Sequence, residues 1–321
     1  MNIPSYARLP MPLFDIPVDN EDIPVVVLTD EMLPEKLRKK QLKIYVLLGF
    51  LANPGNIKRI PASHMINRAL ETGRVKEGGT LVEPTSGNMG VALAYCARKH
   101  NIQVCAIVSN DLPEGKRIPI ERQGARVVTE EEMTNILGLR DTVDSIELAR
   151  LYEQSGDGYF LNQYQNEWNP ESYYKLVAPR FWDGIDGKAS LFVSSVGSCG
   201  TLLGLGTFFK EQNVGLEIVP TMPYLGQKID GLRDIDRLKP VHDRRKLTAV
   251  DEQIDEITAR AYSDRLNKFG IPGGPSSGAA FGTILHILQD RLARGSLEQL
   301  RCADGTIGVI TTFADTMYPY G

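Results

Sequence analysis

The sequence is poor in the residues that build metal sites and disulfide frameworks. Only four cysteines and four histidines occur among 321 residues. The cysteines show no C-x-x-C spacing and stand far apart, at Cys96, Cys105, Cys199 and Cys302. Zinc sites and disulfide-rich domains need closely spaced ligands or a dense set of cysteines. We therefore expect no metal, no disulfide framework, and reduced thiols packed in the core.

The sequence also lacks a surplus of positive charge and a long apolar run. The net charge is −4, with both signs interspersed, which gives no basic face for nucleic acid and no polybasic patch for a membrane. No stretch is long and apolar enough to span a bilayer. Residues 1–20 lack the basic start and apolar run of a signal peptide. We expect a cytoplasmic protein that binds neither nucleic acid nor a membrane.

The length and composition indicate a protein with a large folded core. The 321 residues exceed the length that one hydrophobic core usually serves, which predicts two domains. With 42% hydrophobic and 24% charged residues, the composition is that of a soluble α/β protein and not of a disordered or fibrous one. Because small-molecule sites form in clefts between domains, we expect one there.

Short apolar runs alternate with longer segments of helical periodicity, which predicts open, mostly parallel sheets flanked by helices. We expect strands at 23–28, 44–48, 80–83, 104–108, 126–128, 189–196, 217–220 and 308–313, and helices at 62–72, 90–100, 113–123 and 202–210. No internal repeat is visible. The expected division is a small domain of residues 60–160 within a larger domain built from residues 1–59 and 161–321.

Two turns between an expected strand and an expected helix are rich in glycine and hydroxyl residues. They cover residues 83–90 and 196–201. Such turns expose backbone N–H groups at the positive end of a helix and suit a bound anion, although many serve only to reverse the chain. A nucleotide-binding Rossmann protein ranks last among the alternatives, because no G-x-G-x-x-G is followed by an acid about 20 residues later.

Five separated segments, in the same order, resemble motifs of one family. They are Asn-Pro-Gly-Asn-Ile-Lys at 53–58, Pro-Thr-Ser-Gly-Asn-Met-Gly at 84–90, the segment 160–170, Gly-Ser-Cys-Gly-Thr at 197–201, and Gly-Ile-Pro-Gly-Gly-Pro-Ser-Ser-Gly at 270–278. The chain resembles the pyridoxal 5′-phosphate (PLP) dependent cysteine synthase family, related to tryptophan synthase β chains and serine/threonine dehydratases, over about Ile23 to Asp315. The resemblance implies a two-domain tryptophan synthase β-like fold, PLP as the cofactor, and a homodimer.

The resemblance also implies which residues bind the cofactor. Lys58 would form the Schiff base with PLP, and its buried amine would also remove the α-proton of the substrate. Ser276 would face the pyridine nitrogen, where a hydroxyl moderates the electron sink and favours chemistry at the β-carbon. The simpler interpretation of Ser276 is the N-cap of a helix before Ala279, and the two roles are compatible. The phosphate cradle would consist of Gly197, Ser198, Cys199, Gly200 and Thr201.

A second set of residues is expected to bind the amino acid substrate. The loop at the start of a helix would hold the carboxylate, and the Asn88 side chain would also reach the phenolic oxygen of PLP. A simple helix cap is the alternative for Asn88. By resemblance, Gln163 helps to bind the carboxylate. The loop residues are Thr85, Ser86, Gly87, Asn88 and Met89.

Three departures from the family pattern stand out. The lysine segment is one residue shorter, with Asn56 in place of a serine and Arg59-Ile60 in place of Asp-Arg. Cys199 occupies a glycine position, where a positive φ would strain the backbone. Met89 replaces a threonine beside the substrate loop. The shorter lysine segment would alter stacking on the ring or the reaction that is chosen.

Residues 227–235 bear on specificity, because they resemble members of the family that accept O-phosphoserine more than those that use O-acetylserine. In those relatives an arginine at the place of Arg233 contacts the phosphate leaving group. The planar guanidinium suits this task, since it pairs with two phosphate oxygens at once. The alternative is an exposed ion pair with Asp230 or Asp234.

The predicted reaction is β-replacement on an O-activated L-serine, with O-phosphoserine or O-acetylserine as substrate and aminoacrylate as intermediate. A sulfur nucleophile would give cysteine, and an amine would give a 2,3-diaminopropionate derivative. The shortened lysine segment favours a specialised reaction over housekeeping cysteine synthesis. Two alternatives stay open: β-elimination to pyruvate and ammonia, and a degenerate PLP-binding scaffold that binds a partner.

Overall fold

The computed structural model describes residues 12–233 and 252–317. These residues form two compact units, one of residues 58–172 and one of the described residues before 58 and after 172. Each unit contains a single sheet flanked by helices, so the predicted α/β class with mostly parallel sheets is confirmed. The division into functional domains bounded near residues 60 and 160 stays a prediction.

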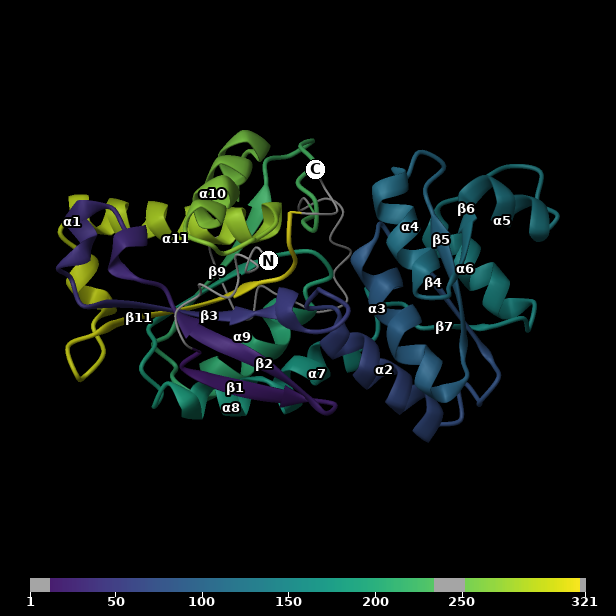
Figure 1. Ribbon diagram of the computed structural model, residues 1–321, viewed down its shortest axis with the longest axis horizontal. Helices are drawn as coiled ribbons and strands as arrows, with labels where there is room; N and C mark the ends of the chain where they lie inside the picture. Colours follow the sequence, from purple (N-terminus) through teal and green to yellow (C-terminus); the bar gives the residue numbers. More distant parts are fainter. Residues whose placement is uncertain (1–11, 234–251, 318–321) are drawn as a thin grey trace, which may run out of the picture. The chain divides into compact units, whose positions relative to one another are not determined.

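The larger unit is built on a seven-stranded sheet in the order β1-β2-β3-β11-β8-β9-β10. All neighbours from β3 to β10 are parallel, whereas β2 pairs antiparallel with both β1 and β3. Near the end of the chain, β11 returns to the middle of the sheet, between β3 and β8 (Figure 1). The strands are Phe14–Val18 (β1), Glu21–Val27 (β2), Leu42–Leu48 (β3), Leu191–Ser195 (β8), Glu217–Pro223 (β9), Glu252–Ile254 (β10) and Ile307–Phe313 (β11).

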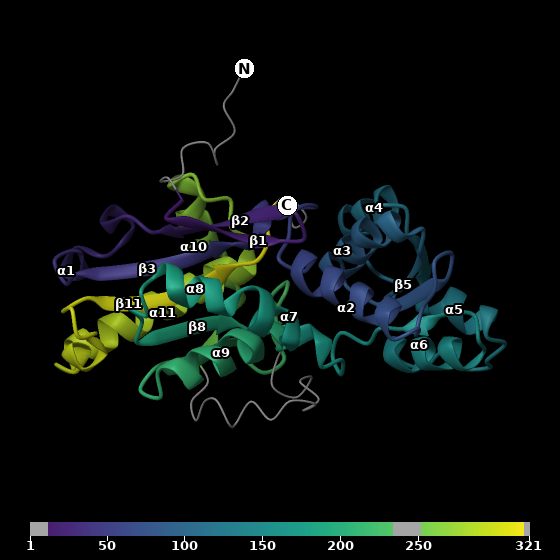
Figure 2. The ribbon, with the colours of Figure 1, turned by 90° about the horizontal axis from the view of Figure 1, so that it is seen from below.

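Helices cover both faces of this sheet. Figures 1 and 2 show α10 and α11 on one face and α8 and α9 on the other. Strand β8 is buried on both faces of the sheet. Val193 packs in the hydrophobic cluster that contains α11, and on the other face Phe192 packs edge to face on Phe209 of α9, with 5.5 Å between the ring centroids. The helices are Glu35–Arg38 (α1), Trp168–Leu176 (α7, which crosses the unit boundary), Ala178–Gly184 (α8), Gly200–Gln212 (α9), Glu256–Lys268 (α10) and Pro275–Ala293 (α11).

The smaller unit contains a four-stranded parallel sheet in the order β6-β5-β4-β7. One hydrophobic cluster joins the sheet to α2 and α3, and a second joins it to α5 and α6. The strands are Thr80–Pro84 (β4), Gln103–Val108 (β5), Arg126–Thr129 (β6) and Tyr159–Phe160 (β7), and the helices are Arg59–Glu71 (α2), Asn88–Ala97 (α3), Glu114–Arg122 (α4), Glu130–Ile136 (α5) and Ser145–Gln154 (α6).

The four cysteines are free thiols, but only two of them lie in the core. Cys96 and Cys105 are buried, and burial raises the pKa of the Cys105 thiol to about 11, so this thiol stays protonated at neutral pH. Cys199 and Cys302 are half-buried, which corrects the expectation that all four thiols pack in the core. Within residues 12–233 and 252–317, no three potential ligand side chains gather as a metal site, and no helix has the length and apolarity to cross a membrane.

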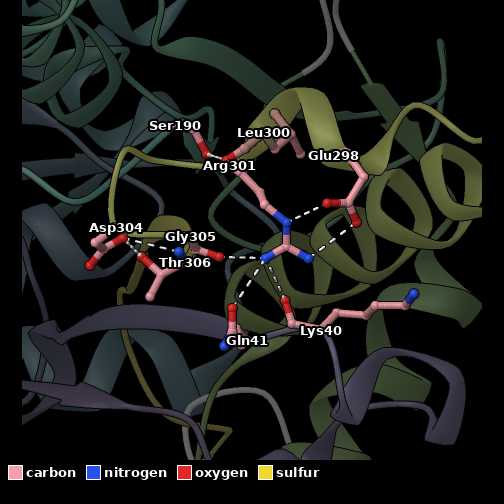
Figure 3. A network of polar contacts seen from close by, with 9 residues as sticks. All are labelled: Lys40, Gln41, Ser190, Glu298, Leu300, Arg301, Asp304, Gly305 and Thr306. Atoms are coloured by element: carbon pink, nitrogen blue, oxygen red, sulfur yellow. Dashed lines mark hydrogen bonds and ion pairs between the residues drawn. The ribbon is translucent and has the colours of Figure 1, made fainter.

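A network around Arg301 fixes the turn that leads into β11 (Figure 3). The guanidinium donates to both carboxylate oxygens of Glu298 and to the carbonyl oxygens of Lys40 and Gly305. Nearby, the Ser190 hydroxyl donates to the Leu300 carbonyl at 2.6 Å. The network lies at the amino ends of β3 and β11. In open α/β sheets ligands bind beyond the carboxyl ends of the strands, so these contacts serve stability.

Helix α11 crosses α10 so closely that Gly278 has no room for a side chain. An added Cβ would lie 2.1 Å from the Ala259 carbonyl oxygen and 2.6 Å from the Ser263 nitrogen. We expect Gly278→Ala to lower the free energy of unfolding by about 1–3 kcal/mol, because backbone atoms cannot move aside. Urea unfolding measures this change. In the control Gly282→Ala, the new Cβ meets side-chain atoms of Tyr262 and no backbone atom of α10, so a smaller loss is expected. A Gly278→Ala protein as stable as the parent would contradict this close crossing of the two helices.

Candidate functional site

The backbone that leads to Lys58 is held firmly. Ile57 is 3% exposed, and its N–H donates to the Ala314 carbonyl at 2.7 Å, just beyond the end of β11. Gly49 lies so close to this residue that a Cβ there would be 2.6 Å from the Ile57 Cβ. Lys58 follows as the N-cap of α2, and its carbonyl accepts the Ala62 N–H at 2.9 Å. The shortened segment therefore delivers a half-buried lysine to the start of a helix.

The two unusual residues beside Lys58 are both buried. Asn56 is 3% exposed and Arg59 is 4% exposed. The Arg59 guanidinium lies over the ring of Tyr95 on α3, at 5.5 Å from its centroid. A cation–π contact of this kind stabilises a buried guanidinium. Arg59 thus packs against α3.

The loop between β4 and α3 is organised by Thr85. Its hydroxyl oxygen accepts the N–H groups of Gly87 and Gly90, each at 3.1 Å. Gly87 is the N-cap, with φ 147° and ψ −89°, a conformation that favours glycine. The alternative that Asn88 is the N-cap is wrong, because Asn88 is the first residue of α3. Thr85 therefore shapes the loop.

The other loop residues differ in what they present. Ser86 is exposed, and Asn88 is half-buried at the start of α3. Met89 is 2% exposed and packs in the hydrophobic cluster of the smaller unit, which leaves its main chain as the part that can face a ligand. The N–H groups of this loop lie at the positive end of α3, where an anion is favoured.

Gln163 is tied to the base of the same loop. It is 5% exposed, and its side-chain amide donates to the Pro84 carbonyl at 3.4 Å. Its main-chain N–H donates to the carboxylate of Glu83 at 3.1 Å, and its carbonyl accepts from Asn169 at 2.8 Å. Glu83 is fully buried. The structure thus brings Gln163 and the predicted substrate loop together within the smaller unit, and it adds Glu83, whose only signal in the sequence is an acid at the end of an apolar run.

The predicted phosphate turn connects β8 to α9. Gly197 must be glycine, since a Cβ there would lie 2.6 Å from the Gly231 carbonyl oxygen. Cys199 has φ 66° and ψ −6°, so the residue at the usual glycine position does adopt the left-handed conformation. Ser198 is 8% exposed, and Gly200 begins α9, with Thr201 next to it. The turn thus places backbone N–H groups at the positive end of a 13-residue helix.

Two further segments of the larger unit converge on this turn. The Arg233 N–H donates to the Val196 carbonyl at 2.8 Å, and a Cβ on Gly231 would lie 3.3 Å from the Ser276 Cβ. The Arg233 side chain is partly exposed. Asp234, one of its two alternative ion-pair partners, lies outside the described residues. The turn, the Arg233 segment and the start of α11 therefore meet beyond the carboxyl end of β8.

Ser276 occupies the first turn of α11. The alternative that Ser276 is the N-cap is wrong, because the N-cap is Gly274 and the helix begins at Pro275. Ser276 is 4% exposed, and its hydroxyl finds no hydrogen-bond partner among the described residues. A buried hydroxyl of this kind can donate a hydrogen bond to a bound group or accept one from it. Its main-chain carbonyl accepts the Ser195 hydroxyl at 2.6 Å.

Comparison with known proteins explains this geometry. The family described as "Pyridoxal-phosphate dependent enzyme" matches residues 31–298. The chain belongs to this family. It is 31% identical over 245 residues to cysteine synthase B of Pseudomonas aeruginosa, covering 74% of this chain and 79% of that protein. It is 27% identical over 286 residues to the O-acetylserine dependent cystathionine beta-synthase of Bacillus subtilis, covering 86% and 87%.

Among solved structures, the crystal structure of O-ureido-L-serine synthase superposes with a TM-score of 0.77 at 26% identity, covering 93% of this chain and 90% of that one. The predicted tryptophan synthase β-like fold, the cysteine synthase-like PLP family and the PLP cofactor are confirmed.

The residues of this PLP enzyme fit its cofactor. The glycine-lined turn at the start of α9 suits a phosphate, and the buried Ser276 hydroxyl, which has no partner in the described part of the chain, suits a ring nitrogen. The site residues fall into two groups, each within one unit. Lys58, residues 85–89 and Gln163 belong to the smaller unit, and residues 197–201, Arg233 and Ser276 belong to the larger one.

Sequence reasoning missed Tyr173, which the structure places beside two predicted cofactor residues. Tyr173 is fully buried, and its hydroxyl donates to the Ile57 carbonyl at a long 3.4 Å, next to Lys58 in the chain. Burial raises the pKa of this hydroxyl, and a hydrogen bond from Thr201 lowers it in part. One hydroxyl thus connects the phosphate turn with the segment that leads to the lysine. An aromatic residue in helix α7 gives no such signal in the sequence.

Replacing the strained cysteine by glycine tests the geometry of the phosphate turn. A residue other than glycine in the left-handed conformation destabilises the folded state by about 1–2 kcal/mol. A glycine in its place lowers the free energy of unfolding by about 0.4–1 kcal/mol, because it increases the conformational entropy of the unfolded chain. We expect Cys199→Gly to raise the free energy of unfolding in urea by about 0.5–1 kcal/mol. Cys199→Ala keeps the Cβ and should show no such gain. An equal gain in both variants would mean that the thiol, not the backbone, is unfavourable.

Two neighbouring tyrosines of α7, Tyr173 and Tyr174, test the hydrogen bonds that Tyr173 makes with Ile57 and Thr201. Tyr173→Phe leaves the Ile57 carbonyl and the Thr201 hydroxyl without this partner, so we expect a loss of about 1–3 kcal/mol in the free energy of unfolding. The neighbouring Tyr174 hydroxyl donates to Glu211 at an exposed position. Tyr174→Phe should therefore change stability by less than about 0.5 kcal/mol. Equal effects in the two variants, measured by urea unfolding, would refute the buried link.

Proposed function

We propose that this PLP enzyme catalyses β-replacement on an O-activated L-serine, with O-phosphoserine as the preferred substrate. The observation that carries the proposal is the meeting of a phosphate-type turn, the Arg233 segment and the Ser276 hydroxyl at the end of β8. The names of similar proteins, which include an O-acetylserine dependent enzyme and an O-ureido-L-serine synthase, support a serine derivative as substrate.

Bound PLP withdraws electrons from the α-carbon of an amino acid, which makes the α-proton acidic and lets a β-substituent leave. In this proposal the Ser276 hydroxyl pairs with the ring nitrogen. A hydroxyl can donate or accept a hydrogen bond, so it does not enforce a charged ring as a carboxylate would. The turn at residues 197–201 holds the phosphate of the cofactor.

Lys58 has two tasks in the proposed reaction. Its amine anchors the cofactor, and, once released by the substrate, it takes the α-proton. The position at the start of α2 supports this, because the positive end of a helix disfavours an ammonium ion and favours the neutral amine that can act as a base.

The loop of the smaller unit binds the substrate carboxylate. The exposed Ser86 hydroxyl and the first N–H groups of α3 are donors that suit an anion, and the Asn88 side chain lies at the same helix start. Thr85 holds the loop in shape through its two bonds to main-chain N–H groups. Gln163, fixed by Glu83 and Pro84, supplies an amide beside the loop.

Arg233 binds the leaving group in this proposal. Its main chain is attached to Val196 at the phosphate turn, and its guanidinium suits a phosphate dianion better than an acetyl ester. The second substrate is a sulfur nucleophile, which gives cysteine, or an amine, which gives a 2,3-diaminopropionate derivative. The family resemblance also implies a homodimer.

A comparison of two substrates tests the proposal. With the PLP-loaded protein, we expect O-phosphoserine to be consumed with a kcat/KM at least about 10-fold above that for O-acetylserine, since charged hydrogen bonds contribute about 1.5–3 kcal/mol. Pyruvate release should fall when sulfide or an amine nucleophile is added. Pyruvate release that no nucleophile reduces would instead identify a β-elimination enzyme. No turnover of either substrate would favour a binding scaffold.

Two variants of the same segment assign the leaving-group contact. Arg233→Gln should lower kcat/KM about 10- to 100-fold with O-phosphoserine and little with O-acetylserine, because only the phosphate loses a charged partner. The control Lys228→Gln removes an exposed cation five positions earlier. An equal loss with both substrates, or in both variants, would remove Arg233 from the proposed role. Lys58→Ala should abolish turnover and the visible absorption of lysine-bound PLP.

A further inference from the structure

The last residue of β8 holds the first turn of α11. The Ser195 hydroxyl donates to the main-chain carbonyl of Ser276 at 2.6 Å, a short distance for this kind of bond. Ser195 is half-buried and Ser276 is nearly fully buried. The two residues are 81 positions apart, so this bond joins a strand end to a helix start that the chain itself does not connect.

The pattern of β8 explains why Ser195 faces α11. Alternate residues of a strand point to the same face. Leu191 and Val193 pack in the hydrophobic cluster that contains Ile284 of α11, so Ser195 lies on that face as well. Thr221 stands beside it on β9, because the register pairs Ser195 with Thr221. The apolar face of the sheet thus ends in hydroxyl groups under the first turn of α11.

This bond restrains the main chain of Ser276 and therefore the direction in which its side chain projects. The Ser276 hydroxyl has no hydrogen-bond partner within the described ranges, so no hydrogen bond of its own orients it there. Its direction therefore depends on the position of the main chain in the first turn of α11. The Ser195 bond restrains that main chain at the carbonyl of the same residue.

We propose that Ser195 is a positioning residue, which holds the Ser276 hydroxyl in line with the ring nitrogen of the bound cofactor. The inference rests on the proposed function, in which Ser276 pairs with that nitrogen. Ser195 touches neither the substrate nor the reacting atoms in this account. It acts on the protonation and absorption of the cofactor ring through the direction of one hydroxyl.

The chain offers a closely matched control in Ser190, just before the other end of β8. The Ser190 hydroxyl donates to the Leu300 carbonyl at 2.6 Å, the same distance and the same kind of bond (Figure 3), and it makes a longer contact of 3.3 Å with the Gly308 carbonyl. Ser190 is also half-buried. It belongs to the network at the amino ends of the strands, away from the carboxyl end of β8. Ser190→Ala therefore removes a comparable bond without touching the candidate site.

The test compares PLP-loaded Ser195→Ala and Ser190→Ala proteins. Both should lose thermal stability to a similar extent. Only Ser195→Ala should shift the visible absorption of the bound cofactor and the pH at which that absorption changes. Its kcat should fall about 2- to 10-fold, which corresponds to the loss of one ordinary hydrogen bond. Ser195→Thr, which keeps the hydroxyl, should restore the parent spectrum and pH profile.

Further variants separate this inference from the proposed function. If Ser276→Ala leaves the spectrum and its pH dependence unchanged, Ser276 is not the ring partner, and the inference falls with that assignment. If Ser276→Ala changes them and Ser195→Ala behaves like Ser190→Ala, only the role of Ser195 is refuted. In the Ser276→Ala background, Ser195→Ala should add no further spectral change, because the two residues act through one hydroxyl.

Discussion

The close approach of the Gly231 carbonyl to Gly197 is the contact on which the candidate site depends. A Cβ on Gly197 would lie 2.6 Å from that oxygen, so any other residue would push the two segments apart. The approach lets the Arg233 N–H reach the Val196 carbonyl, and it sets Gly231 against Ser276. Because Gly197 has no side chain, the phosphate-type turn, the arginine segment and the start of α11 can pack against one another beyond the carboxyl end of β8.

Much of the fold could be predicted because most central strands are buried on both faces and appear as continuous apolar runs. Residues 104–108 are an example, since all five are buried in β5. The strand predicted at residues 217–220 ends at Pro220, whereas β9 continues to Pro223. Strand β1 was missed. Its residues Phe14–Val18 contain a proline and pair with β2, and a window of sequence does not show that pairing.

The candidate site could be predicted as a set of motifs, but not as a set of contacts. The motifs indicated Thr85 as a ligand for the substrate, which stays a prediction, but they did not indicate the bonds of its oxygen to two N–H groups of its own loop. The bonds of Ser195 and Tyr173 join residues 81 and 116 positions apart. Local patterns carry information about turns and caps, and such long-range bonds follow only from the packing of the whole sheet.

The shortened lysine segment is the departure that most favours a degenerate scaffold, and the structure shows how the fold holds this segment. The backbone before Lys58 is held at Ile57, whose N–H donates to the Ala314 carbonyl and whose carbonyl accepts from the Tyr173 hydroxyl. These two bonds lie between the shortened part of the segment and Lys58, so the lysine can keep its place when a residue is lost earlier in the segment. Asn56 and Arg59 are buried beside the lysine, and Arg59 packs on Tyr95. These contacts fit the altered residues into the fold on both sides of the lysine.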